Sequence, residues 1–165
     1  MTSKPIVLIG PMGVGKTTIG KKLARKLGLP FVDTDVLISK AHGPIPEIFA
    51  SKGEATFRAY EEEAVAVALS EVQVIATGGG AVLSGQTQRN LANAIVIYLS
   101  TNGKHMKSRL EKGNRPLLKN GMDDWNRIYE ERKPLYESIC TFEIETAEVG
   151  LGQTISDICE KLDSL

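Results

Sequence analysis

Short, mainly apolar runs recur along the chain and predict buried β-strands. The runs lie at residues 6–9, 31–33, 74–76, 95–99 and 142–144. Strands that do not alternate between apolar and polar residues are covered on both faces, which is typical of parallel sheets. The pattern therefore predicts a five-stranded parallel sheet.

Longer amphipathic segments separate these runs and predict α-helices. In residues 16–27 the apolar positions recur three and four residues apart, so they share one helical face. Helices are also predicted at residues 54–69, in the stretch ending at Leu110 and at residues 155–162. This alternation of strands and helices indicates a three-layer α/β fold, in which ligands bind at the carboxyl ends of the strands.

Residues 112–124 differ from the rest because they are rich in glycine, asparagine and proline. This composition predicts a mobile loop. A loop of that length within a compact domain is more often a functional lid than a simple connection. We therefore expect a lid over the ligand-binding edge of the sheet.

The composition limits the class of protein. The chain has 165 residues, of which 42% are hydrophobic and 24% charged, as expected for one globular domain spanning residues 1–165. Basic and acidic residues are equal at 20 each, so the net charge gives no indication of a nucleic-acid or membrane partner. The apolar run near the N-terminus is too short for a signal peptide or a membrane span. Cys140 and Cys159 lack metal-ligand spacing, and we expect a cytoplasmic protein with reduced thiols.

Residues 10–17, Gly-Pro-Met-Gly-Val-Gly-Lys-Thr, match the phosphate-binding pattern G-x-x-x-x-G-K-[ST] between a predicted strand and a predicted helix. The glycines allow backbone N–H groups to surround phosphate oxygens, and the helix N-terminus adds its positive dipole. Lys16 can reach the β- and γ-phosphates of a nucleoside triphosphate, and the Thr17 hydroxyl can ligate Mg²⁺. The motif indicates nucleotide binding but not the acceptor, because switch proteins, motor ATPases and kinases share it.

Two carboxylates, Asp33 and Asp35, follow the second predicted strand, and we expect both at the ligand-binding edge. Asp33 could hold the water shell of a metal ion. Asp35 could accept a hydrogen bond or a proton from an acceptor hydroxyl. Alternatively, Asp35 is an N-cap, since it precedes an apolar stretch and Asp is favoured at that position. The residues alone leave both interpretations open.

Arg58 and Glu61 are three residues apart in a predicted helix and therefore share a face. They form either an exposed ion pair or a site in which Arg58 binds an anionic group and Glu61 orients it. Arg132 lies in a further predicted helix. Arginines away from the phosphate loop suggest an acceptor with a carboxylate, because guanidinium binds carboxylate bidentately.

Three consecutive glycines, Gly78, Gly79 and Gly80, follow the third predicted strand, although a simple tight turn needs only one or two. Bare backbone at that point allows a cyclic substrate to approach closely, with N–H groups as donors. Arg115 lies in the expected lid. Closure of the lid would bring its guanidinium over the phosphates.

Taken together and in order, these motifs resemble those of shikimate kinases along nearly the whole chain. The resemblance rests on the phosphate loop, D-T-D at 33–35, F-R-x-x-E at 57–61, T-G-G-G at 77–80, R-P-L-L at 115–118 and R-x-P-L-Y at 132–136. It implies a P-loop NTPase fold like that of nucleoside monophosphate kinases, with strand order 2-3-1-4-5. It also implies a shikimate-binding segment around residues 33–61 and a lid around residues 112–124.

The resemblance further implies roles for single residues. ATP would be bound by Gly13, Val14, Gly15, Lys16, Thr17, Thr18, Arg109 and Arg115, with Arg109 against the adenine. Shikimate would be bound through its hydroxyls by Asp35, Gly78, Gly79 and Gly80, and through its carboxylate by Arg58 and Arg132, with Glu61 in support. Lys16, Asp35 and Arg115 would be catalytic: Asp35 as the base, the other two as charge-stabilising groups. Thr17 and Asp33 would be the Mg²⁺ partners, Asp33 through water.

The implied reaction is transfer of the γ-phosphoryl group of ATP to the 3-hydroxyl of shikimate, a step of chorismate and aromatic amino-acid biosynthesis. The substrates would be Mg·ATP and shikimate, and one complete site in a small domain indicates a monomer. Alternatives are a gluconate-type or other small-molecule kinase, a nucleoside monophosphate kinase and a nucleotide-gated binding module without catalysis. The ordered motifs argue against a gluconate-type acceptor, and no base-recognition segment is evident in the sequence.

Overall fold

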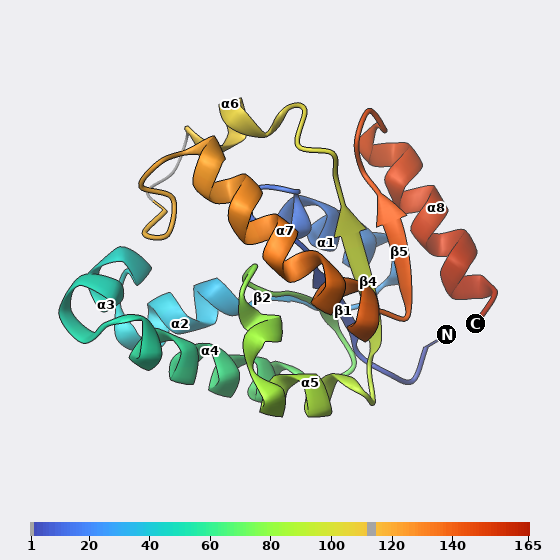
Figure 1. Cartoon of the computed structure of the whole chain (residues 1–165). Helices are drawn as coiled ribbons and strands as arrows, with labels where there is room; N and C mark the ends of the chain where they lie inside the picture. Colours follow the sequence, from blue (N-terminus) through green and yellow to red (C-terminus); the bar gives the residue numbers. More distant parts are fainter. Residues whose placement is uncertain (1, 112–114) are drawn as a thin grey trace.

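The predicted strands form one parallel sheet in the order β2-β3-β1-β4-β5 (Figure 1). The computed structural model describes residues 2–111 and 115–165. The strands are β1 (Ile6–Ile9), β2 (Phe31–Asp33), β3 (Val74–Ala76), β4 (Ile95–Ser100) and β5 (Phe142–Glu145). The parallel pairing and strand order expected from the sequence are confirmed.

Helices cover both faces of this sheet. They are α1 (Lys16–Leu27), α2 (Thr34–His42), α3 (Ile45–Lys52), α4 (Glu54–Ala68), α5 (Gly85–Leu91), α6 (Met106–Leu110), α7 (Met122–Ile139), α8 (Leu151–Asp163) and the short 3₁₀ helix η1 (Ala81–Leu83). Apolar residues of α1 and α8 pack on one face, and those of α5, α6 and α7 pack on the other. Across the described ranges, no helix combines the length and apolar character that a membrane span requires.

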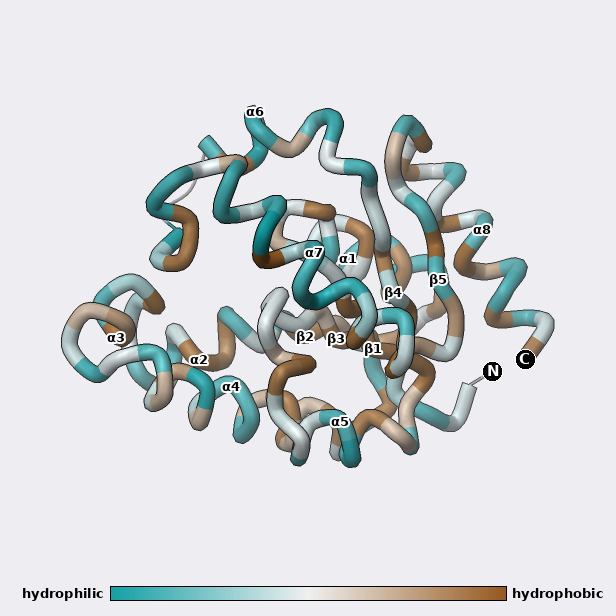
Figure 2. The backbone as a smooth tube through the Cα atoms, in the orientation of Figure 1, coloured by the Kyte–Doolittle hydropathy of each residue, from teal (hydrophilic) through white to brown (hydrophobic). Residues whose placement is uncertain are grey.

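The central strand β1 explains why the strand sequences are apolar without alternation. Val7 and Ile9 point to the face covered by α7, whereas Ile6 and Leu8 point to the face covered by α1 and α8. Figure 2 shows the result: hydrophobic segments gather on the central strands, and hydrophilic ones are common on the outer helices. The predicted three-layer architecture follows directly from this two-sided burial.

Helices α2, α3 and α4 form a lobe at one side of the sheet (left in Figure 1). This lobe has its own small core, built around Ile38, Ile48, Phe57 and Ala64. Of these helices, α4 was predicted directly, and a helix after Asp35 was considered only through the possible N-cap role of that residue. Helices α2 and α3 are short and are separated by Gly43 and Pro44, so neither presents a long periodic pattern. The lobe coincides with the segment predicted to bind the acceptor.

The predicted lid is shorter than expected in the part that the structure describes. Residues 112–114 lie outside the described residues, and residues 122–124 form the first turn of α7 rather than a loop. The Asp124 carboxylate accepts a hydrogen bond from the Asn120 N–H at 2.9 Å. This contact satisfies a donor at the helix N-terminus, where an acidic side chain is also favoured by the helix dipole.

Candidate active site

The predicted functional residues converge on the carboxyl edge of the sheet, where two cavities adjoin. The first, the P-loop cavity, has a volume of 540 Å³, and the second, the arginine cavity, has a volume of 390 Å³. Both volumes are typical of small-molecule sites. The two cavities share the lining residues Met12, Asp35, Gly78, Gly79 and Arg115. Groups bound in the two cavities would therefore meet at these residues.

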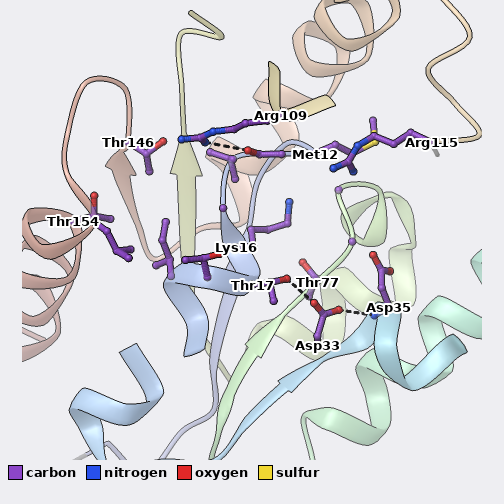
Figure 3. A pocket seen from close by; sticks show the side chains of 18 of the residues that line it. Met12, Lys16, Thr17, Asp33, Asp35, Thr77, Arg109, Arg115, Thr146 and Thr154 are labelled. Atoms are coloured by element: carbon purple, nitrogen blue, oxygen red, sulfur yellow. Dashed lines mark hydrogen bonds between the residues drawn. The ribbon is translucent and has the colours of Figure 1, made fainter. Parts of the chain in front are cut away.

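Each predicted set of residues lies together in one of the cavities. The residues expected to bind ATP and metal line the P-loop cavity: Gly13, Val14, Gly15, Lys16, Thr17, Thr18, Asp33, Arg109 and Arg115. The residues expected to bind the acceptor line the arginine cavity: Asp35, Arg58, Glu61, Gly78, Gly79, Gly80 and Arg132. Figure 3 shows Asp33 and Asp35 at one end of the P-loop cavity and Thr146 and Thr154 at the other.

The phosphate loop depends on its glycines for backbone conformation. Gly10, Gly13 and Gly15 have φ angles of 146°, 79° and 105°, in the region that side-chain-bearing residues rarely adopt. A Cβ on Gly10 would also lie 2.5 Å from the Leu99 carbonyl oxygen. The loop is held from outside by Trp125 on α7, whose indole N–H donates to the Met12 carbonyl at 2.9 Å. The loop is thus fixed between β4 and α7.

Lys16 is buried at the centre of the site. Its ammonium group donates to the carbonyl oxygens of Gly10 at 2.7 Å and Pro11 at 2.8 Å. Burial lowers the pKa of Lys16 to about 8, against the opposing attraction of Asp35. The cation is therefore poorly compensated by its surroundings, which favours binding of a polyanion such as a triphosphate.

Asp33 joins the phosphate loop to α2. Its Oδ2 accepts a hydrogen bond from the Thr17 hydroxyl at 2.6 Å, and its Oδ1 accepts from the Asp35 N–H at 2.9 Å (Figure 3). The N-cap of α2 is therefore Asp33, and the capping role considered for Asp35 is wrong. Because the backbone turns into the helix one residue after the strand, Asp35 already lies within the first turn.

The Asp35 carboxylate does not cap the helix, so it can bind a ligand in the cavities. Its Oδ1 is buried and has no hydrogen-bond partner among the described residues. Burial, followed by the charge of Asp33, raises the pKa of the Asp35 carboxyl, while Lys16 acts in the opposite direction. A buried acceptor without a partner costs free energy unless a ligand satisfies it. A substrate hydroxyl is a suitable partner.

Arg58 and Glu61 form a largely buried ion pair rather than an exposed one. The Arg58 Nη1 donates to the Glu61 Oε1 at 2.7 Å, and the two side chains are 22% and 4% exposed. Burial raises the pKa of Glu61, and the Arg58 charge lowers it. The exposed ion pair that the sequence left open is therefore wrong, because the α2–α4 lobe packs around this face of α4.

The three glycines after β3 provide space rather than unusual backbone angles. None of them has a positive φ. A Cβ on Gly78 would lie 2.6 Å from the Glu61 Oε2, and a Cβ on Gly79 would lie 3.3 Å from the Met12 Cγ. A Cβ on Gly80 would collide with the Arg58 guanidinium. Each glycine therefore allows a different group of the site to approach the backbone.

The remaining arginines surround the cavities. Arg132 on α7 is buried and lines the arginine cavity. Arg115 lines both cavities. Arg109 lies at the rim of the P-loop cavity, where its Nη1 donates to the Gly13 carbonyl at 3.1 Å. Arg109 and Arg115 thus line the P-loop cavity, and Arg115 and Arg132 line the arginine cavity, which suits an anionic pair of substrates.

Comparison with known proteins assigns the family. The family model described as shikimate kinase matches residues 12–163. The shikimate kinase of Streptomyces coelicolor is 45% identical over 150 residues, covering 88% of each chain. That of Francisella tularensis subsp. novicida is 42% identical over 171 residues, covering 98% of this chain and 94% of its own. The chain belongs to the shikimate kinase family.

Solved structures agree with this assignment. A shikimate kinase from Acinetobacter baumannii in complex with shikimate is 36% identical and has a TM-score of 0.93, covering 99% of this chain and 94% of its own. A shikimate kinase from Bacteroides thetaiotaomicron is 29% identical with a TM-score of 0.85, covering 97% of this chain and 98% of its own. A gluconokinase from Sinorhizobium meliloti shares 16% identity with a TM-score of 0.62 and so shares the fold alone. The gluconate-type alternative is therefore not favoured over the shikimate kinase family.

Sequence reasoning missed one wall of the P-loop cavity in this member of the shikimate kinase family. Thr146, Val149, Leu151 and Thr154, from the end of β5 and the start of α8, line the cavity opposite Asp35. No motif marks these residues. The signal that could have found them is topological, because the carboxyl end of the last parallel strand lies at the same edge as the phosphate loop.

Proposed function

We propose that the chain transfers the γ-phosphoryl group of ATP to the 3-hydroxyl of shikimate, giving shikimate 3-phosphate and ADP, a step of aromatic amino-acid biosynthesis. The observation that carries this proposal is the pair of adjoining cavities. One is lined by the phosphate loop, and the other by three arginines, two carboxylates and bare glycine backbone. Membership of the shikimate kinase family identifies the substrates.

The arginine cavity suits a small carbocyclic acid. Arg58 and Arg132 offer guanidinium donors for a carboxylate. Apolar side chains form the remaining wall: Pro44, Ile45, Pro46, Phe49 and Phe57. This wall fits the apolar face of a ring, whereas an open-chain polyol such as gluconate would leave hydroxyls against it without partners. The cavity thus favours shikimate over gluconate on physical grounds.

The residues around the shared lining perform the transfer. Asp35 accepts the proton, or a hydrogen bond, from the attacking hydroxyl, which then forms the new O–P bond as the bond to ADP breaks. Lys16 and Arg115 stabilise the negative charge on the transferring group and on the leaving ADP. Positioning of the two substrates and charge neutralisation supply most of the rate acceleration.

We further propose that ATP is bound together with Mg²⁺, held by Thr17 and Asp33. Mg²⁺ prefers hard oxygen ligands and keeps several waters, so it needs few protein ligands besides substrate phosphates. The Thr17 hydroxyl and the Asp33 carboxylate already meet at 2.6 Å within the P-loop cavity, which fits a shared role toward one ion. When bound, Mg²⁺ would neutralise charge on the β- and γ-phosphates.

We assign residues 1–165 to a single kinase domain, residues 33–61 to shikimate binding and residues 112–124 to a lid. The lid assignment is supported by Arg115, Pro116 and Leu117, which line the arginine cavity from the described end of that segment. We also propose that the protein is a monomer, because one small domain supplies all the residues expected to bind the two substrates. Cys140 and Cys159 are free thiols, as is usual in a reducing cytoplasm.

An ADP-release assay with Mg·ATP tests the reaction. Shikimate, gluconate, nucleoside monophosphates and a blank without acceptor are compared at equal concentrations. We expect ADP release that depends on shikimate alone. Release that is equal without acceptor, or faster with gluconate, contradicts the proposal. The Asp35→Asn variant then separates the roles of Asp35: a fall in kcat indicates a base, whereas an unchanged kcat with a raised KM for shikimate indicates a binding residue.

A further inference from the structure

Tyr136 makes a contact that the proposed chemistry does not use. Its side chain is only 1% exposed, and it lies one helical turn after Arg132 on α7. Its hydroxyl donates to the Gly79 carbonyl oxygen at 2.5 Å. Tyr136 itself lines neither cavity. It touches the site through the backbone of the glycine triplet, and the Arg132 side chain lies beside it.

The carbonyl that Tyr136 holds belongs to the same peptide unit as the Gly80 N–H. A peptide bond is planar, and in the trans form its C=O and N–H point in opposite directions. No peptide bond in the described residues is cis. Fixing the Gly79 carbonyl toward α7 therefore directs the Gly80 N–H away from α7. Gly80 lines the arginine cavity.

The Gly80 N–H is available to a ligand. Among the described residues, no backbone or side-chain acceptor receives a hydrogen bond from it, and the same holds for the Gly79 N–H. Buried amide donors are almost always paired in folded proteins, by protein, water or ligand. These two unpaired N–H groups lie beside a cavity lined with arginines. They indicate that oxygens of the bound acceptor accept hydrogen bonds from them.

The glycine triplet needs an external restraint to keep this orientation. Glycine has more conformational freedom than any other residue, and three in a row can turn their peptide planes at little steric cost. The local bonds from the Ala81 N–H to Gly78 at 3.2 Å and from the Leu83 N–H to Gly80 at 3.1 Å leave the peptide between Gly79 and Gly80 unrestrained. Tyr136 supplies that missing restraint.

The environment of Tyr136 keeps its hydroxyl protonated, so that it remains a hydrogen-bond donor. Its ring packs against those of Tyr98 and Tyr129, with centroids 5.2 Å and 6.4 Å apart. Burial raises the pKa of Tyr136 to about 12, so the phenol keeps its proton throughout the working range of pH. Donation to a carbonyl also polarises the peptide unit and strengthens its N–H as a donor.

We propose that Tyr136 is a positioning residue, which orients the peptide between Gly79 and Gly80 so that the Gly80 N–H donates to an oxygen of the acceptor. This inference rests on the proposed function, because it names shikimate as the occupant of the arginine cavity. It adds a residue of α7 that acts on the acceptor through the backbone rather than by direct contact. Two residues of α7, Arg132 and Tyr136, then contribute to binding of the acceptor.

The Tyr136→Phe variant tests this role because it removes one hydroxyl and retains the ring packing. We expect the KM for shikimate to rise about three- to tenfold, the usual effect of losing one hydrogen bond, with the KM for ATP changed less than about twofold. Tyr129→Phe is the matched control. Tyr129 is also buried on α7, but its hydroxyl bonds the Tyr98 hydroxyl at 2.6 Å rather than the glycine triplet. That variant should leave the KM for shikimate unchanged.

If the role of Tyr136 is purely structural, both variants should lose thermal stability, and in each the KM for shikimate and the KM for ATP should stay unchanged. This result overturns the proposal. An equal rise in the KM for shikimate and for ATP also overturns it. If wild-type protein does not turn over shikimate at all, the proposed function fails instead, so the two failures are distinguishable.

A measurement on wild-type protein remains decisive even where Tyr136→Phe does not fold. The amide proton resonance of Gly80, followed by ¹⁵N-edited NMR, should move downfield when shikimate is added, as expected for a new hydrogen bond. The Leu83 amide, which already donates to Gly80 at 3.1 Å, is the internal reference. A Gly80 resonance that does not move, or that moves upfield, overturns the proposal.

Discussion

The two cavities of the site are built in different ways. The longest continuous part of the P-loop cavity's lining is residues 12–19, on the phosphate loop and the first turn of α1. The arginine cavity is assembled from α2, α4, the turn after β3 and α7, which are far apart in the sequence. The phosphate loop at the centre of the first cavity is a local structure, whereas the second cavity as a whole is a product of tertiary packing. Nucleotide binding is therefore encoded locally, whereas acceptor choice depends on the whole chain.

The glycines of the two cavities show the same difference. In the phosphate loop, Gly13 and Gly15 have positive φ angles, so glycine is required for backbone conformation. After β3, Gly80 has a φ of −100°, which any residue adopts, and glycine is required only because Arg58 occupies the space beside it. A substitution in the first set strains the backbone, and a substitution in the second set displaces a binding group.

The largest expected effect comes from removing the charge of Lys16. In Lys16→Met we expect kcat to fall about 10²- to 10³-fold, because one stabilising contact to the transferring phosphoryl group is lost. The KM for shikimate should change much less, since the arginine cavity stays intact. Steady-state kinetics with both substrates measures this. Lys22→Met, at an exposed position of the same helix, is the control and should match wild type.

Arg132→Lys tests the arginine cavity and ranks second. Lysine keeps the charge but loses the bidentate geometry, so we expect kcat/KM for shikimate to fall about 10- to 100-fold. The KM for ATP should stay nearly constant. Arg127→Lys on the same helix, where the side chain is 57% exposed, is the matched control. Equal losses for both substrates would contradict the separation of the two cavities.

Gly80→Ala should have a smaller effect on the same cavity. The Arg58 Cζ lies 2.6 Å from the position of the new Cβ, so the guanidinium must move. We expect about a tenfold rise in the KM for shikimate, from a weakened charge-assisted hydrogen bond. Thermal unfolding should change little, because the flexible end of a side chain gives way. Gly85→Ala, which meets only the Arg89 Nη1 at an ordinary 3.6 Å, is the control.

The smallest expected effect near neutral pH is the pH dependence of the reaction. The basic limb should come from the P-loop cavity and the acidic limb from the arginine cavity. Lys16 loses its charge as the pH rises through about 8 in the free protein, so kcat/KM for ATP should fall above that pH. Asp35 must be ionised to accept the hydroxyl proton. Because its pKa is raised by burial, kcat/KM for shikimate should fall on acidification at a higher pH than an ordinary carboxylate would allow.

The corresponding measurement is a pH profile of kcat/KM for each substrate in turn, with the other saturating. The Asp35→Asn variant should lose the acidic limb of the shikimate profile while it retains the basic limb of the ATP profile. An acidic limb that persists unchanged in this variant would show that another group controls it.

The sequence predicted the strands, α1 and the phosphate loop closely because these features depend on local pattern. Residues 16–27 form α1 with the predicted bounds, since Gly28 adopts the left-handed conformation, with φ 67°, that ends a helix. Family resemblance supplied the members of both cavities, and the structure brings them together. Their functional roles stay predictions.

Features that depend on tertiary contacts were not predictable. Whether Arg58 and Glu61 are exposed depends on packing of the α2–α4 lobe, which their spacing on α4 does not encode. The N-cap of α2 falls on Asp33 rather than Asp35 because β2 and α2 are directly joined. The contact from Tyr136 to Gly79 spans 57 positions of sequence, and no local pattern indicates it.

The most direct test of the central claim is ³¹P NMR of the product formed from Mg·ATP and shikimate by the wild-type protein. The account predicts a phosphate monoester whose phosphorus couples to the ring proton at carbon 3, formed in step with ADP. A monoester at another hydroxyl would mean that the arginine cavity holds the ring in a different orientation. Inorganic phosphate and ADP as the only new signals would contradict the account, because they would mean that the chain hydrolyses ATP without using the acceptor.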